Sequence, residues 1–156
     1  MDPQTGEYLV KQNVSYAVEL MKHAAKEGSL EASANLGRIL VTGVYDYKNG
    51  TYILRPNASL ALFFLNHSIE DEFPMGFHTL AEVVHYNSIE LPKNFIDLYN
   101  LTTEENKCEL SVHFYAKSVL RGYLKSWLTL AEKRYILKDY DGAHLLYSYS
   151  SFLGLP

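Results

Sequence analysis

Apolar residues recur at helical spacing near the start of the chain. Five of them fall on one face of a helix, namely Tyr16, Leu20, Met21, Ala24 and Ala25. Gly28 then interrupts the pattern, and the same spacing resumes through Leu36 and Leu40. Gly43 ends it in the manner of a glycine that follows a helix. The pattern therefore predicts a helix hairpin over about residues 14–44.

The same pattern returns along the chain, so the hairpin is predicted to be a repeat. The segment 24–37 aligns without gaps to 68–81 and to 118–131. The predicted repeats span about 14–44, 57–87, 106–138 and a truncated 139–156, with inserted loops at 44–56 and 88–105. The residues that recur, and that are predicted to pack, are Ala17, Ala24, Ala25, Gly28, Ala32, Leu36, Gly37, Ala61, Ser68, Gly76, Leu80, Ala81, Ser111, Ser118, Gly122, Ser126, Leu130, Ala131, Ala143, Ser150 and Gly154.

Small residues at fixed places allow helices to approach closely, while the large residues between them fill the interface. Each hairpin alone buries too little apolar surface, so neighbouring hairpins must stack and share one continuous core. Gly28 and Gly122 permit the tight turn between two helices, and Pro74 ends the turn of the second repeat. The predicted fold is all-α, a right-handed solenoid of stacked helix hairpins that forms a single domain over 14–154.

Composition and charge exclude several classes of protein. The chain has 156 residues, 47% of them hydrophobic and 21% charged, which is typical of a folded domain. A formal charge of −4 without a cluster of Lys or Arg argues against nucleic-acid binding. The longest apolar run, at 60–65, is far shorter than a membrane span, and the first residues lack a signal-peptide pattern. We expect the chain to be a fragment of a longer protein.

The residues that could carry chemistry do not form a known catalytic or metal-binding motif. His78 and His85 could share a helix face with Glu82 between them, but catalytic zinc prefers His at i and i+4. Cys108, the single cysteine, could pair with His113 as nucleophile and base, although a structural cysteine is the favoured interpretation. The sequence therefore predicts no enzyme activity, no metal and no cofactor.

Acceptor sites for N-glycosylation are more frequent than chance predicts. Nine Asn and a Ser/Thr fraction of 19 in 156 predict about 1.1 sites, and five are present. The candidates for glycosylation are Asn13, Asn49, Asn57 and Asn100. Asn66 is expected to stay unmodified, because it lies inside a predicted helix. The excess predicts a chain that enters a glycosylating, luminal compartment. The alternative is a polar surface that is never exposed to the enzyme that attaches N-linked glycans.

Aromatic residues crowd the last third of the chain. Packing between helices is the favoured interpretation, and a face of Tyr and Trp for a partner protein is the alternative. Tyr147 aligns with Leu65 and Tyr115 and is predicted to lie in the core. Trp127 follows a small packing residue and is the candidate for partner binding. The last predicted helix lacks its partner, so self-association through the truncated repeat is expected.

The spacing Ala-x6-Ala-Ala-x-x-Gly-x-x-x-Ala-x-x-x-Leu-Gly, found at 17–37, resembles the Sel-one-like repeat, a relative of the tetratricopeptide repeat. Glycosylation sites and long insertions together resemble the luminal Hrd-three/Sel-one-like adaptor of the HRD ubiquitin ligase. The resemblance implies a non-catalytic protein scaffold in the endoplasmic-reticulum lumen that serves protein degradation. Its partners would be a membrane ubiquitin ligase, a lectin and misfolded glycoproteins.

Two other interpretations remain open. A cytoplasmic or bacterial Sel-one-like scaffold in signalling or host interaction would make the glycosylation sites accidental. A hydrolase related to cysteine-rich bacterial members of the family is disfavoured, because those proteins pair cysteines within each repeat and this chain has only Cys108.

Overall fold

The computed structural model describes residues 13–47 and 49–155, and these residues are mostly helical. The helices are α1 (Val14–Lys26), α2 (Leu30–Thr42), α3 (Ala58–Glu70), α4 (Pro74–Tyr86), α5 (Lys93–Tyr99), α6 (Glu104–Leu120), α7 (Lys125–Ile136) and α8 (Tyr140–Phe152). Two short strands, β1 (Val44–Asp46) and β2 (Thr51–Leu54), form an antiparallel pair. The prediction of a chiefly helical protein is therefore confirmed.

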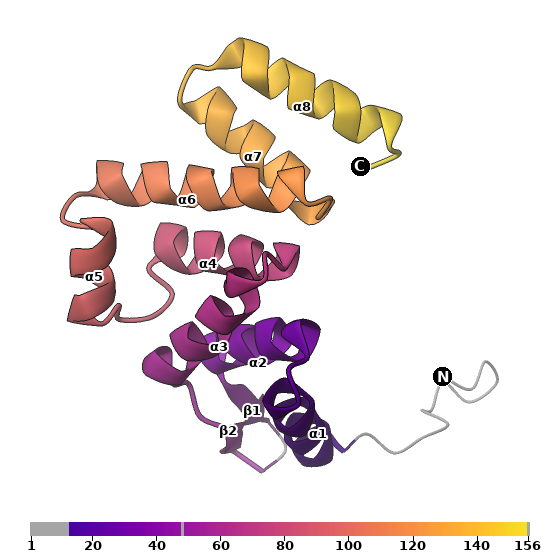
Figure 1. The fold of residues 1–156 in the computed structure, drawn as a ribbon, viewed down its shortest axis with the longest axis vertical. Coiled ribbons are helices and arrows are strands. Elements are labelled where there is room, and N and C mark those ends of the chain that lie inside the picture. Colours follow the sequence, from indigo (N-terminus) through magenta and orange to yellow (C-terminus); the bar gives the residue numbers. More distant parts are fainter. Residues whose placement is uncertain (1–12, 48, 156) are drawn as a thin grey trace.

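Successive helices pack on one another along the longest axis of the molecule (Figure 1). The most extensive contacts join α2 to α3, α4 to α6 and α7 to α8, and α1 also packs on α2. One cluster of buried apolar side chains runs from Ala25 in α1 to Leu130 in α7. The core is therefore continuous along the stack, and each helix contributes a part of it.

Side chains and turn conformations set the limits of the helices. Five N-cap residues accept a hydrogen bond from the backbone N–H three residues ahead, at 2.9–3.2 Å, and they are Asn13, Ser29, Asn57, Thr103 and Asp139. Left-handed backbone ends the turns between paired helices, at Gly28 (φ 91°), Glu72 (φ 60°) and Gly122 (φ 83°). In the second pair Pro74 opens α4 directly after this turn.

Two glycines lie where helices cross too closely for a side chain. A Cβ added at Gly37 would lie 2.6 Å from Leu65 Cγ, across the contact between α2 and α3. A Cβ added at Gly76 would lie 2.0 Å from the hydroxyl oxygen of Ser68, across the contact between α3 and α4. The helices therefore approach one another at predicted packing positions, and glycine is required there by the close approach.

Most of the recurring small residues are buried. The structure places these at 8% exposure or less: Ala25, Ala32, Ala61, Ser68, Ala81, Ser111, Ser118, Ser126, Ala131, Ala143 and Ser150. Several of the buried serines satisfy their hydroxyls within their own helix, as Ser68 does on Leu65 O (2.6 Å) and Ser111 on Cys108 O (2.8 Å). Serine can therefore replace alanine at such a contact without leaving an unpaired polar atom.

The remaining predicted packing residues, apart from Ala17, divide into two groups. Gly37, Gly76, Leu36, Leu80 and Leu130 are buried, and Ala24 is half-buried. Gly28, Gly122 and Gly154 are exposed in turns with positive φ.

Two residues predicted to pack are exposed instead. Ala17 is exposed on α1, because no described helix covers the side of α1 that corresponds to the buried Ala61 on α3. Tyr147 is 40% exposed on α8, whose contacts within the described residues are chiefly with α7. Both predictions were wrong for the same reason, since a repeat position is buried only where a neighbouring helix covers it.

The inserted segments are more regular than the sequence analysis expected. Residues 44–56, predicted to be an inserted loop, contain the strands β1 and β2, so the prediction of a loop without regular structure is wrong there. Residues 88–105 contain the short helix α5, whose Phe95 is 4% exposed and packs into the core. Among the helices of residues 13–47 and 49–155, none combines the length and apolar character that a membrane-spanning helix needs.

Candidate functional site

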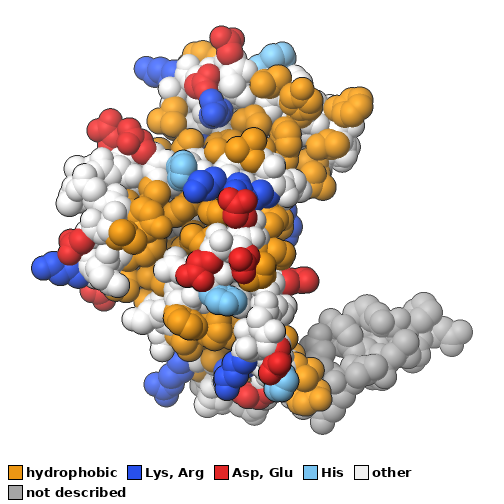
Figure 2. Space-filling view, in the orientation of Figure 1, with side chains coloured by type: hydrophobic (Ala, Val, Ile, Leu, Met, Phe, Trp, Pro, Cys, Tyr) orange, Lys and Arg blue, Asp and Glu red, His pale blue; other side chains and the backbone are white. Residues whose placement is uncertain are grey.

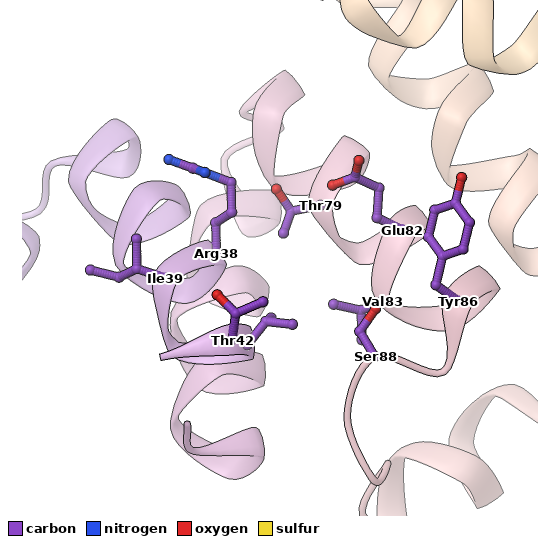
Figure 3. Close-up of a pocket in the computed structure, with 9 residues that line it drawn as sticks. Arg38, Ile39, Thr42, Thr79, Glu82, Val83, Tyr86 and Ser88 are labelled. Carbon is purple, nitrogen blue, oxygen red and sulfur yellow. The ribbon is translucent and has the colours of Figure 1, made fainter. Parts of the chain in front are cut away.

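A groove of about 310 Å³ lies between α2 and α4 (Figure 3). Its volume is at the lower end of the range for ligand sites, about 300–1,000 Å³. The groove is lined by Arg38, Ile39, Val41 and Thr42 of α2, by Thr79, Glu82, Val83 and Tyr86 of α4, and by Ser88. These residues repeat every three or four positions because one face of each helix is turned toward the groove.

The floor of the groove carries a polar group without a partner. Thr79 is 2% exposed, and its hydroxyl oxygen makes no hydrogen bond within the structure. In Figure 3 its side chain lies between those of Arg38 and Glu82. An unpaired buried hydroxyl costs free energy, about 1–3 kcal/mol, unless a ligand or water satisfies it. Thr79 therefore carries unused hydrogen-bonding capacity beside the groove, which a polar ligand can reach once the atoms that cover this hydroxyl move aside.

The two helices present opposite charges to the groove. Arg38 of α2 is exposed, and Glu82 of α4 is half-buried. Glu82 Oε1 lies 3.4 Å from His78 Nε2 on the same helix. The hydrogen bond from His78, with the charges of His78 and Arg38, lowers the pKa of Glu82 despite its partial burial. The carboxylate is therefore ionised at neutral pH, on the opposite side of the groove from Arg38.

Behind the groove, a chain of hydrogen bonds runs from His78 into the core. His78 Nδ1 lies 2.8 Å from the hydroxyl of Ser126 in α7, and Ser126 lies 2.7 Å from the hydroxyl of Ser118 in α6. Ser118 in turn donates to the carbonyl of Pro74 at 2.7 Å. All three side chains are buried. The chain joins α4, α6 and α7 at one point, next to the groove.

A second pair of titratable groups joins α4 to α7. The Lys133 ammonium contacts His85 Nε2, and it lies 5.7 Å from the centre of the Tyr86 ring. Burial, followed by the charge of Lys133, lowers the pKa of His85. Burial also lowers the pKa of Lys133, which is 7% exposed. Because neutral His85 accepts the hydrogen bond, the pair is stable only while His85 is unprotonated.

The histidines and Cys108 do not form the constellations that the sequence analysis considered. Within residues 13–47 and 49–155, no group of three His, Cys, Asp or Glu side chains could hold a metal ion. Cys108 is a half-buried free thiol, and His113 is exposed. Burial, and then the charge of Lys117, lowers the pKa of His113.

The glycosylation candidates lie at exposed positions that also shape the backbone. Asn13 and Asn57 are N-caps whose Oδ1 accepts the hydrogen bond, so the amide nitrogen that a glycan would modify is not used in the cap. Asn100 adopts left-handed backbone after α5, and the amide of Asn49 donates to Asp46 Oδ2 at 2.6 Å. Asn66 is half-buried within α3.

Trp127 does not present a free aromatic face. Its ring is half-buried and meets Tyr149 of α8 edge-on, with ring centres 5.8 Å apart. Its indole nitrogen is buried without a hydrogen-bond partner. The residue that the sequence suggested for partner binding therefore packs between α7 and α8.

Sequence reasoning missed the groove itself. Arg38, Thr79 and Glu82 belong to no motif, and only the contact between α2 and α4 brings them together. The sole signal in the sequence was the presence of polar residues on otherwise apolar helices. Compared with known proteins, the chain matches no family model and no curated protein sequence.

Proposed function

We propose that the chain is a non-catalytic scaffold that binds an extended segment of another polypeptide in the groove between α2 and α4. The buried, unpaired hydroxyl of Thr79 is the observation on which the proposal depends. An extended segment offers main-chain N–H and C=O groups that must be hydrogen-bonded when they are buried. Arg38 can donate to such carbonyls, Glu82 can accept from such N–H groups, and Thr79 can do either.

We also propose that the helices form a right-handed solenoid of Sel-one-like hairpins. Two features support it, namely the close approaches at Gly37 and Gly76 and the burial of small residues at corresponding positions of successive helix pairs. Stacked hairpins offer long surfaces that suit polypeptide partners, and the groove lies on such a surface.

A luminal adaptor of a ubiquitin ligase that acts in endoplasmic-reticulum-associated degradation is our proposal for the cellular role. It is supported by the five acceptor sites and by the exposure of four of them, at Asn13, Asn49, Asn57 and Asn100. The caps at Asn13 and Asn57 are compatible with a glycan, because capping uses Oδ1 and glycosylation uses the amide nitrogen. Misfolded glycoproteins, a lectin and the membrane ligase would then be the partners.

Binding to an unfolded chain tests the groove. Fluorescein-labelled α-lactalbumin, unfolded by reduction and carboxymethylation, is titrated with the protein and followed by anisotropy, with native α-lactalbumin as the folded control. Thr42→Trp fills the groove from its exposed edge, and Ser148→Trp places the same side chain on the exposed face of α8. We expect the first variant to lose at least tenfold in affinity and the second to bind as the wild type does. Equal binding by both variants would remove the groove from the proposal.

Routing the chain through a secretory pathway tests the compartment. We expect a glycosidase-sensitive increase in mass of several kDa that falls stepwise when Asn13, Asn49, Asn57 and Asn100 are changed to Gln. Asn66→Gln is the control and should leave the mass unchanged. A chain that gains no mass would instead favour a cytoplasmic or bacterial scaffold with the same binding groove.

A further inference from the structure

The hydrogen-bond chain behind the groove can run in only one direction. A carbonyl oxygen only accepts, so Ser118 must give its single hydroxyl proton to Pro74. The Ser118 oxygen is then left to accept, so Ser126 gives its proton to Ser118. The Ser126 oxygen must therefore accept as well, and the remaining partner, His78 Nδ1, has to carry a proton.

The other ring nitrogen of His78 faces a carboxylate. With a proton on Nδ1, a neutral imidazole presents the lone pair of Nε2 to Glu82 Oε1, 3.4 Å away, and the contact is repulsive. With protons on both nitrogens, the ring donates to Ser126 at one end and to Glu82 at the other. The arrangement in the structure is thus satisfied in full only when His78 is an imidazolium.

The surroundings of His78 suit a cation. The rings of Tyr115 in α6 and of Tyr123 in the α6–α7 turn lie 5.5 Å and 5.0 Å from the imidazole centre. Burial raises the pKa of both tyrosines, so they stay neutral beside the imidazole. Lys125 of α7 and Arg38 of α2 act on this site through Glu82, which they help to keep ionised.

We propose that His78 is a proton-operated latch that controls the charge of the groove. When both ring nitrogens carry a proton, the imidazolium holds the Glu82 carboxylate in a pair, and less negative charge faces the groove. When Nε2 gives its proton to solvent, Nδ1 keeps its proton because Ser126 requires it, and Glu82 is released to the groove.

The latch assigns a regulation to the groove and so rests on the proposed function, but its chemistry can be tested without a partner. In the full chain labelled with ¹⁵N-histidine, long-range proton–nitrogen NMR spectra show which ring nitrogens are protonated. For His78 we expect both nitrogens protonated at pH 5.5 and only Nδ1 protonated at pH 8. Protonation of Nε2 alone at pH 8 would mean that Ser126 donates to the ring, and it would overturn the proposal.

Two serine variants make the test specific. Ser118→Ala removes the acceptor that fixes the direction, so Ser126 becomes free to donate to His78, and we expect the neutral ring to move its proton to Nε2. Ser111→Ala is the matched control, because Ser111 is equally buried on α6 but donates to Cys108 O and takes no part in the chain of hydrogen bonds. If both variants leave Nδ1 protonated, Ser118 does not set the direction and the latch is refuted.

Binding then shows whether the latch acts on the groove. The probe is a labelled peptide of alternating Lys and Ser. Releasing one carboxylate about 4 Å from a cationic side chain in water corresponds to an affinity change of about fivefold. We expect the peptide to bind about fivefold more tightly at pH 8 than at pH 5.5, and Glu82→Gln to abolish the difference. If the NMR result is as expected but the peptide binds equally at both pH values, the latch does not control the groove. If nothing binds the groove at either pH, the proposed function fails and the proton arrangement stands.

Discussion

The contact between α3 and α4 offers the sharpest test of how the helices stack. Gly76 lies in the first turn of α4 and is buried, and a Cβ there would lie 2.0 Å from Ser68 Oγ and 3.1 Å from Ser68 Cβ. An exposed glycine in a helix loses about 1 kcal/mol relative to alanine, so Gly76→Ala would be stabilising if space were available. The structure predicts the opposite.

The size of the effect follows from the two ways to relieve the clash. Ser68 can rotate, but its hydroxyl is fully buried and donates to Leu65 O at 2.6 Å, so rotation costs about 1–3 kcal/mol. Alternatively the helices separate, and overpacking of this kind costs about 1–3 kcal/mol. Either route offsets the gain in helix propensity of about 1 kcal/mol. We therefore expect Gly76→Ala to lower the free energy of unfolding by about 0–2 kcal/mol instead of raising it.

Urea-induced unfolding followed by circular dichroism at 222 nm measures this change, provided that the slope of the unfolding free energy against urea concentration is the same for variant and wild type. The double variant Ser68→Ala/Gly76→Ala removes the oxygen that meets the new Cβ, so it should recover most of the loss and show a coupling energy of about 1 kcal/mol or more. Ser148→Ala, on the exposed face of α8, should change stability by less than about 0.5 kcal/mol. A Gly76→Ala protein about 1 kcal/mol more stable than the wild type, or strictly additive effects in the double variant, would refute the close approach.

Three further predictions follow from other contacts. Gly37→Ala should also lower stability, by about 0–2 kcal/mol in urea unfolding after the helix-propensity gain is counted, because its Cβ would meet Leu65 Cγ at 2.6 Å, and a raised midpoint would contradict this. Since burial and Lys133 hold the pKa of His85 below its ordinary value of 6.5, the unfolded chain binds a proton first, and stability should fall as the pH drops below about 6.5. Thermal unfolding between pH 8 and pH 5 measures this fall, which His85→Gln should reduce because glutamine accepts from Lys133 without titrating. Helix α8 carries exposed hydrophobic side chains, among them Leu145 (56%), Tyr149 (50%) and Phe152 (87%), and Figure 2 shows hydrophobic side chains gathered in this part of the molecule. Sedimentation velocity should show concentration-dependent association that Phe152→Lys weakens.

The helix pairs could be predicted from the sequence because their signals are local. The turn glycines Gly28 and Gly122, the capping residue Ser29 and the helical spacing of apolar residues each act within a few positions. The strands β1 and β2 also had a local signal. Asn49 and Gly50 stand between two runs rich in Val, Tyr, Thr and Ile, and this pattern is typical of a β-hairpin.

Burial at the ends of the stack and the composition of the groove could not be predicted in this way. Ala17 and Ala61 occupy the same place in the repeat, yet only Ala61 is covered by a neighbouring helix. Arg38 and Glu82 face one groove because α2 and α4 pack side by side, and no spacing along the chain records that contact. Repetition in a sequence specifies which residues are equivalent, whereas their surroundings depend on what packs against each copy.

The replacement of alanine by serine in the later helix pairs connects packing to chemistry. At Ser111 and Ser150 the hydroxyl is satisfied by a carbonyl of the same helix, so these serines act only as small residues. Ser118 and Ser126 are equally buried, but their hydroxyls bond across helices, to Pro74 O and to each other. A serine that takes the position of alanine in a helix contact can therefore bond within its own helix or across the contact, and the direction of its hydroxyl decides which. Where the hydroxyl bonds within its own helix, alanine can replace the serine. Where it bonds across the contact, as at Ser126, the close approach of the helices places the serine oxygen within hydrogen-bond distance of the buried His78.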